Sequence, residues 1–508
     1  MGPNPSKSPD LMGRPSLPRL RISAAISSSV HFPAIDLALQ TPEIGRLSKS
    51  FGSAITWCAK MNLVLGTLFP SKWIAITEFV TKVAGCRRGA WREDEGRSVA
   101  SEFDTVGLAR ASLIPEALIQ QGILSGAVTL VWKDGDIRDV TVLGERNIER
   151  RDPMTRDTLF RVASMSKPIT SVAAMMLVED GLLALDSPIA RWLPELADLR
   201  VLRNGDGPLD DTVPAQRDLM VEDLLTHRAG FIYGFSASGP IVGAYEDALG
   251  NILETLATPD EWLTALGSLP LAFQPGEQFR YSYATDVLGC LVGRVAGMSF
   301  RDFLRERLLD PMGMVDTDFY VPAEKLGRLA TIYRHDKTIG ELAPVPIKAP
   351  AAAPALCGGG GGMFSTADDY LRFARMLLND GELAGQRLLQ PETVALMRGN
   401  RLSDEQRRVD FLGRPGFWSG QGFGLGLSMI TDVQAHAAHG AGSVGAFGWP
   451  GAFGTWWQAD PQENAILIYL VQNSEPVVPP AQEDGGAAVS PVRAAMQEWQ
   501  RAIYASFR

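Results

Sequence analysis

The sequence is poor in the features that mark membrane-spanning, nucleic-acid-binding and disulfide-stabilised proteins. It has only four cysteines in 508 residues, and the spacing of Cys58, Cys86, Cys290 and Cys357 fits neither a metal site nor a disulfide framework. No uncharged apolar run approaches the roughly 20 residues that a membrane-spanning helix needs. The formal net charge is −10, whereas nucleic acids attract a basic surface. We therefore expect no disulfide framework, no membrane span and no nucleic-acid partner.

The composition is otherwise that of a globular protein with a sizeable core, with 45% hydrophobic and 21% charged residues. Residues 1–103 carry scattered proline, serine and basic residues without a repeating pattern, and we expect a poorly ordered N-terminal extension there. The first residues lack the apolar core of a secretory signal, which favours a cytoplasmic protein. Residues 104–508 show regular helix and strand patterns and are expected to form one large domain.

Strand patterns occur near both ends of this domain. Residues 126–133 and 137–143 flank Asp134-Gly135, a strong hairpin signal. Near the C-terminus, 452–458 and 465–471 are predicted to form two antiparallel strands.

Helical patterns lie between and beside these strands. They cover 108–121, the segment after Ser164, residues 365–379 and a final segment that begins at Ser490-Pro491. We expect an α/β fold in which an antiparallel sheet flanked by helices is built from N- and C-terminal parts. The α/β part would take about 104–185 and 356–508, with a large, mainly helical inserted region at about 186–355.

One short motif carries chemistry. Ser164 and Lys167 form the chain's single Ser-x-x-Lys, placed where a predicted strand leads into a helix. Three residues apart on a helix, the two side chains share a face and can form a hydrogen bond. The positive end of the helix favours negative charge on the serine and disfavours a charged lysine, and both effects help to activate a serine.

Two further segments extend the pattern. Tyr281-Ser282-Tyr283 follows a Pro-Gly, and Trp449-Pro450-Gly451-Ala452 lies in a glycine-rich segment ahead of a strand. In this order, the three motifs resemble the serine β-lactamase and penicillin-recognising superfamily of the class C type. The likeness is greatest to the family VIII carboxylesterases and covers roughly 104–508.

The resemblance implies a role for each motif. Ser164 would be the nucleophile, with Lys167 and Tyr281 as its shared acid and base. The backbone N–H groups of Ser164 and Ala452 would form the oxyanion hole. We expect no cofactor. His436-x-x-His439 has the spacing of two metal ligands but no further ligand cluster beside it, so we expect no metal.

Departures from the lactamase pattern point to the substrate. Tyr283 stands where lactamases have asparagine, and Trp449 where they have a lysine that holds the drug's carboxylate. Losing this polar anchor and gaining aromatic surface favours small to medium apolar esters. The residues expected to contact the substrate are Tyr233, Tyr283, Phe447, Trp449 and Gly451.

The sequence therefore predicts a serine carboxylesterase that forms an acyl-enzyme on Ser164. Three alternatives stay open: a β-lactamase or D-amino-acid peptidase, an acyltransferase with the same nucleophile, and a non-catalytic ligand-binding relative. A different nucleophile, Ser443 within Ala-Gly-Ser-Val-Gly, is disfavoured because a strand follows it and not a helix. The natural substrate and the oligomeric state cannot be predicted.

Overall fold

The fold was examined in a computed structural model of the chain. The structure describes residues 104–336, 338, 340–409, 411, 412, 414, 416–475 and 490–507. The predicted N-terminal extension lies outside the described residues. Within the described part of the chain, no helix is long and apolar enough to cross a membrane.

The centre of the fold is an antiparallel sheet made from both ends of the domain. Its strand order is β12-β13-β14-β15-β16-β1-β2-β3, so N-terminal β1 pairs with C-terminal β16, with Val128 opposite Leu470. This confirms the predicted architecture. The strands are β1 (Gly126–Lys133), β2 (Asp136–Asn147), β3 (Asp152–Pro153), β12 (Gln421–Phe423), β13 (Ser428–Ile430), β14 (Phe447–Gly448), β15 (Trp456–Asp460) and β16 (Ala465–Leu470).

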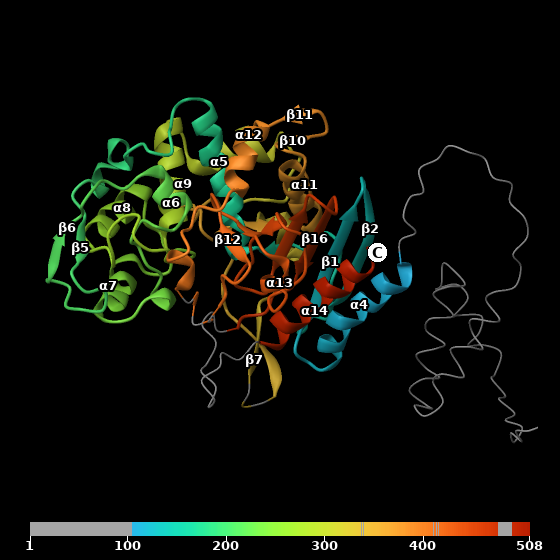
Figure 1. Cartoon of the computed structure of the whole chain (residues 1–508). Coiled ribbons are helices and arrows are strands. Elements are labelled where there is room, and N and C mark those ends of the chain that lie inside the picture. Colours follow the sequence, from blue (N-terminus) through green and yellow to red (C-terminus); the bar gives the residue numbers. More distant parts are fainter. Residues whose placement is uncertain are drawn as a thin grey trace, which may run out of the picture. The chain divides into compact units, whose positions relative to one another are not determined.

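Side chains of the central strands alternate between two hydrophobic cores, as the period of a strand requires. Val131 of β1 and Leu467 of β16 face α4 (Thr105–Gln120) and α14 (Pro491–Ala505). Figure 1 shows these two helices lying together along the sheet. The side chain of Ser490 accepts a hydrogen bond from the Arg493 N–H and caps α14, so the predicted helix start is confirmed.

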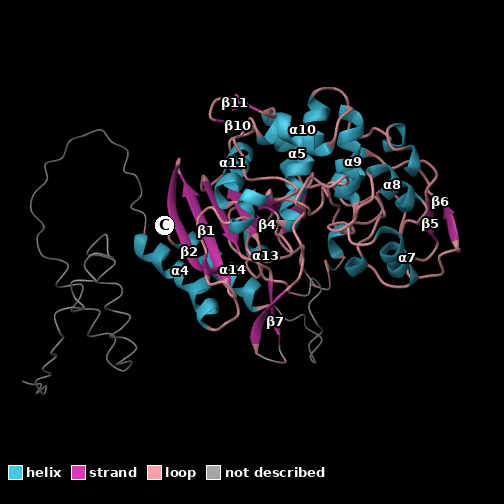
Figure 2. Ribbon diagram, turned by 180° about the vertical axis from the view of Figure 1, so that it is seen from behind, coloured by secondary structure: helices cyan, strands magenta, loops and turns pink. Residues whose placement is uncertain are grey.

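The opposite face of the sheet covers the main core. Leu130 and Ile468 point into it and pack with residues of α5 (Ser166–Glu179) and α11 (Ala367–Leu378). Beyond them lies the inserted region, which Figure 2 shows from behind with the β5–β6 hairpin on its outer side. Its helices are α6 (Val221–Leu225), α7 (Pro240–Leu249), α8 (Pro259–Gly267), α9 (Ala284–Ala296) and α10 (Phe300–Leu304). The sequence did not predict its two hairpins, β5 (Arg200–Leu202) with β6 (Thr212–Pro214) and β7 (Tyr333–Asp336) with β8 (Glu341–Pro344).

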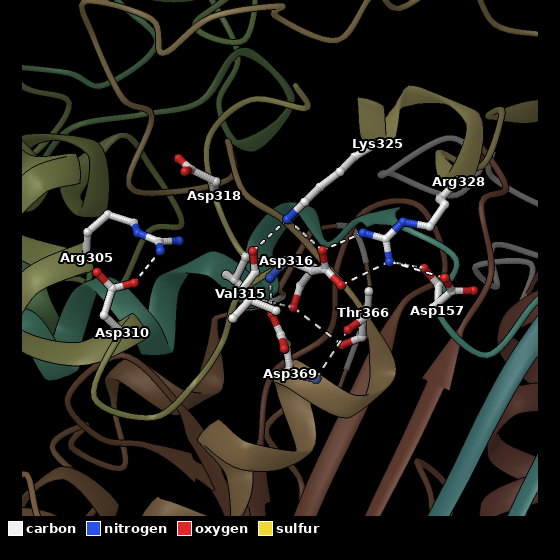
Figure 3. A network of polar contacts seen from close by, with 12 residues as sticks. Asp157, Arg305, Asp310, Val315, Asp316, Asp318, Lys325, Arg328, Thr366 and Asp369 are labelled. Carbon is white, nitrogen blue, oxygen red and sulfur yellow. Dashed lines mark hydrogen bonds and ion pairs between the residues drawn. The ribbon is translucent and has the colours of Figure 1, made fainter. Parts of the chain in front are cut away.

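A network of charges joins the end of the insertion to the α/β part (Figure 3). The Asp316 carboxylate forms ion pairs with Lys325 Nζ at 2.7 Å and with Arg328. Arg328 also donates a hydrogen bond to Asp157. The Asp316 N–H donates to the buried carboxylate of Asp369 in the first turn of α11. Each exposed ion pair of the network contributes little to the stability of the fold. The buried Asp369 carboxylate contributes more, because leaving it without hydrogen-bond donors would be costly. The network thus fixes where the chain re-enters the α/β part.

One predicted strand is wrong at its start. The expected strand 452–458 begins only at Trp456, because the Gly451 N–H donates to the Thr455 carbonyl at 2.7 Å and closes a turn. Gly454 completes this turn with a φ of +81°, a conformation that glycine adopts without strain. Residues 449–455 therefore form a loop at the entry of β15.

Candidate active site

Ser164 lies on a tight turn between β4 (Phe160–Arg161) and α5. The turn is a short 3₁₀ helix, η2 (Ala163–Met165), and Ala163 has a φ of +44°. Non-glycine residues rarely adopt this conformation and do so mainly where the surroundings enforce it. Here the Ser166 hydroxyl donates to the Ala163 carbonyl at 2.7 Å and accepts from the Met363 N–H. The result is a half-buried Ser164 hydroxyl at the head of the helix.

Lys167 follows on the first turn of α5 and points back to this hydroxyl. Its side chain is 1% exposed, and its Nζ lies 3.4 Å from Ser164 Oγ. The amine also donates to the Gly360 carbonyl at 2.5 Å and to the Tyr233 hydroxyl at 3.3 Å. The structure thus brings Ser164 and Lys167 together as their spacing predicts.

Tyr233 is half-buried and extends the hydrogen bonds of the amine. Its hydroxyl donates to Asp286 Oδ2 at 3.0 Å, and the Gly360 N–H donates to Asp286 Oδ1 at 2.8 Å. Burial, followed by the nearby Asp286 charge, raises the pKa of Tyr233 well above its ordinary value. Burial also raises the pKa of Asp286, against the opposing effect of the Lys167 charge.

Sequence reasoning missed Asp286 and Gly360. We name Lys167, Tyr233, Asp286 and Gly360 the lysine cluster. A Cβ on Gly360 would lie 2.6 Å from Asp286 Oδ2 and 2.7 Å from the Tyr233 hydroxyl, so the cluster requires glycine there. The available signals were a lone acid in the apolar α9 segment and the five-glycine run at 358–362.

Tyr281 presents its ring to the amine. Lys167 Nζ lies 4.4 Å from the centre of that ring, within the range of a cation–π interaction. The Tyr281 hydroxyl accepts from Trp449 Nε1 at 3.0 Å and, among the described residues, makes no hydrogen bond to Ser164 or Lys167. Both aromatic residues belong to a buried cluster that we name the aromatic cluster: Phe279, Tyr281, Leu402, Phe411, Trp418, Phe423 and Trp449.

The loop at 449–455 passes directly beside the turn that leads to Ser164. A Cβ on Gly451 would lie 2.4 Å from the carbonyl oxygen of Val162, two residues before Ser164. Ala452 is exposed, and its N–H has no acceptor among the residues that the structure describes. The predicted part of Ala452 in an oxyanion hole requires an N–H without an acceptor, as this one is within the described part of the chain.

The remaining two predicted substrate contacts differ in their surroundings. Tyr283 is half-buried and packs edge-on against Tyr233 at 4.5 Å. Phe447 is 1% exposed and packs on Trp457 in the main core. The predicted substrate contact of Phe447 stays a prediction, and a substrate would reach this side chain only if its neighbours moved.

Replacing Gly451 with alanine should lower both stability and catalysis. The added Cβ would collide with Thr455 Oγ1 at 2.1 Å and with the Val162 carbonyl at 2.4 Å, so backbone next to Ser164 must move. We expect a loss of about 1–3 kcal/mol in the free energy of unfolding. Thermal unfolding and ester hydrolysis measure the two effects. As a control, Gly243→Ala in α7, where nothing lies within 4 Å of the new Cβ, should gain up to about 1 kcal/mol and keep full activity.

Comparison with known proteins agrees with this fold. A sequence model of the beta-lactamase family matches residues 111–489. Protein Rv1367c of Mycobacterium tuberculosis is 50% identical over 370 residues, covering 73% of this chain and 90% of that protein. Esterase EstB of Burkholderia gladioli is 33% identical over 401 residues, covering 74% and 93%. The solved structure of EstCE1, described as a hydrolase with promiscuous acyltransferase activity, has a TM-score of 0.63 at 28% identity and covers 78% of this chain and 99% of its own.

Fold and relatives together define a serine hydrolase with a beta-lactamase fold. The chain belongs to the beta-lactamase family, and its relatives include esterases and acyltransferases. The expected kinship with penicillin-recognising enzymes and family VIII carboxylesterases is thereby confirmed, as is the prediction of a hydrolytic enzyme.

Proposed function

We propose that the chain is a carboxylesterase that hydrolyses small to medium apolar esters through an acyl-enzyme on Ser164. The observation that carries this proposal is the contact between Lys167 Nζ and Ser164 Oγ, 3.4 Å apart at a strained strand-to-helix turn. Such a contact lets the amine take the serine proton as the oxygen attacks. The similarity to Esterase EstB supports the choice of ester hydrolysis.

We assign each step of the proposed reaction to one residue. Ser164 Oγ attacks the ester carbonyl and passes its proton to Lys167 Nζ. The N–H groups of Ser164 and Ala452 stabilise the oxyanion that forms. Tyr281 gives its proton to the departing alkoxide and regains one from Lys167. Since its oxygen already accepts from Trp449, its own hydrogen is free to be donated. Water then repeats the sequence on the acyl-enzyme.

The aromatic cluster supports an apolar, uncharged substrate. Trp449 occupies the position of the carboxylate-binding lysine of lactamases, and it is buried against Tyr281 and Phe423. It offers one neutral N–H donor, which Tyr281 takes. Trp449 therefore offers a carboxylated substrate no cation at this position, and the carboxylate would lose its solvation there.

The substrate class is tested by two chromogenic substrates assayed side by side, a short-chain p-nitrophenyl ester and a cephalosporin. We expect kcat/KM for the ester to exceed that for the cephalosporin by at least about 10³-fold, since an unmatched buried carboxylate costs several kcal/mol. A Trp449→Lys variant should lower the ratio of kcat/KM for the ester to kcat/KM for the cephalosporin, because the new lysine can bind the carboxylate of the cephalosporin. Comparable turnover of both substrates by the unmodified chain would refute the substrate class and leave the nucleophile standing.

Acyl transfer is a second candidate, favoured by the similarity to EstCE1 and to acyltransferases such as mokF of Monascus pilosus. The two activities differ only in whether water or an alcohol takes the acyl group from Ser164. Adding a primary alcohol to the ester assay and separating ester from acid product measures this partition. Acid as the main product at moderate alcohol concentrations is the result that a carboxylesterase gives.

A further inference from the structure

The amine of Lys167 is surrounded by acceptors. Its three neighbours are the Gly360 carbonyl at 2.5 Å, the Tyr233 hydroxyl at 3.3 Å and Ser164 Oγ at 3.4 Å. A lysine ammonium has three hydrogens and no lone pair, so all three would be donated and none of these contacts could receive the serine proton. The role of base proposed above therefore requires that one proton first leaves the amine.

A hydrogen-bonded path for that proton runs away from Ser164. The Tyr233 oxygen accepts from Lys167 Nζ, and its own hydrogen is donated to Asp286 Oδ2 at 3.0 Å. Asp286 is 1% exposed, and its other oxygen accepts from the Gly360 N–H. The three side chains thus form a single file from amine to phenol to carboxylate, closed off from solvent at the acid end.

The chemistry of the path suits proton storage. Burial raises the pKa of Asp286, so this side chain takes up a proton more readily than an exposed aspartate does. Burial and the Asp286 charge keep the pKa of Tyr233 high, so the phenol can pass a proton on without remaining ionised. Gly360 fixes the positions of both ends of the path. Its carbonyl accepts a hydrogen bond from Lys167, and its N–H donates one to Asp286.

The other titratable groups around the amine do not replace this acid. His227 is buried, and burial together with the Lys167 charge lowers its pKa well below the ordinary value, so it is neutral. Burial raises the pKa of Tyr283 to about 12 and also raises the pKa of the Cys290 thiol, so neither ionises near neutral pH. Tyr281 offers its ring face to the amine.

We propose that Asp286 stores the proton that Lys167 must lose and that Tyr233 relays it. This inference rests on the proposed function of Ser164 and Lys167. An N–H bond of Lys167 breaks as an O–H bond forms on Tyr233, while the original Tyr233 hydrogen moves to Asp286 Oδ2. The charged pair becomes a neutral amine and a neutral carboxylic acid, with no proton exchanged with solvent. Tyr233 and Asp286 are positioning residues, because they act on the substrate only through Lys167.

The relay predicts an unusual dependence on pH. In the unmodified chain the neutral amine arises by internal transfer, so activity persists down to the pH at which the Lys167–Asp286 pair takes up a second proton. In Asp286→Asn, Lys167 must release its proton to water, and the acid limb of the pH profile should move up by about one unit or more. In Tyr233→Phe the limb should move higher still, because the retained carboxylate holds the proton on the amine while the path is cut. If Asp286 acted only by its charge, removing it would move the limb down.

The experiment follows the rate at which a p-nitrophenyl phosphonate labels Ser164, from pH 4 to pH 10, with the labelled residue identified by mass spectrometry. The expected order of the acid limbs is unmodified chain, then Asp286→Asn, then Tyr233→Phe. Asp369→Asn is the control, since it removes another buried carboxylate, one that accepts from Asp316 and Thr317 and from no member of the lysine cluster, and it should leave the limb in place. If the acid limbs of Asp286→Asn and Tyr233→Phe stay at the pH of the unmodified chain or move to lower pH, the proposed relay is refuted. If Asp286→Asn does not fold, Tyr233→Phe alone tests the relay. The relay is refuted if this variant keeps the acid limb of the unmodified chain and labels Ser164 at a rate within about two-fold of it. A phosphonate found elsewhere than on Ser164 refutes the proposed nucleophile, which is a different outcome.

Discussion

Replacing Ser164 with alanine should lower kcat/KM for a short-chain ester by at least about 10⁴-fold. The proposed nucleophile and its base work together, so removing one of them also removes the rate enhancement of the other. The hydroxyl removed is half-buried and contacts the Lys167 amine at 3.4 Å. The fold should survive with a change of less than about 1 kcal/mol, as for most changes outside a packed core. Ester hydrolysis and thermal unfolding on the same preparation separate the two effects.

Ser166 provides the matched control for this variant. It lies two residues away in the same motif, but its hydroxyl serves the backbone, donating to the Ala163 carbonyl and accepting from the Met363 N–H. Ser166→Ala should therefore cost about 1–3 kcal/mol in the free energy of unfolding. It should lower turnover far less than Ser164→Ala, because it loosens the turn at Ser164 without removing the Ser164 hydroxyl. Turnover retained in Ser164→Ala and lost in Ser443→Ala would contradict the proposed nucleophile.

The part of the site that the sequence predicts is the part built from local geometry. Ser164 and Lys167 are three residues apart, and a helical turn alone brings their side chains together. Lys167 meets Gly360 across 193 positions of the chain, and Tyr233 meets Asp286 across 53. No spacing rule relates such positions, since their contact depends on how the inserted region folds onto the α/β part. The family resemblance supplied Tyr281 but gave no reason to expect that Trp449 holds its hydroxyl.

The fold shows the same division. The hairpin at Asp134-Gly135 and the helix start at Ser490 were predicted correctly, because turn and capping preferences act over a few residues. The start of β15 was misplaced because Ala452 and Phe453 extend the apolar pattern of Trp456 and Trp457. A turn forms there instead, since Gly451 must approach the Val162 carbonyl closely and Gly454 adopts a positive φ. The close approach of two backbone segments thus overrides the strand pattern.

Replacing Lys167 with methionine should lower kcat/KM by about 10²–10⁴-fold, the usual contribution of a positioned base. Methionine is similar in length to lysine and suits a residue that is 1% exposed, so the turn at Ser164 should persist. Lys133→Met is the control. Lys133 is also buried and donates to Glu463, but it lies on β1 outside the site, so its loss should affect stability and not turnover.

The Lys167→Met variant should also change how stability depends on pH. Asp286 loses the cation that opposes the effect of burial, so its pKa rises further above the ordinary value of about 4. A carboxyl group whose pKa is higher in the folded than in the unfolded state takes up a proton on folding, so the free energy of unfolding falls as pH rises through that interval. Chemical denaturation from pH 4 to pH 8 should show a steeper decline for Lys167→Met than for Lys167→Met combined with Asp286→Asn. Parallel curves for the two variants would mean that Asp286 does not depend on Lys167 for its charge.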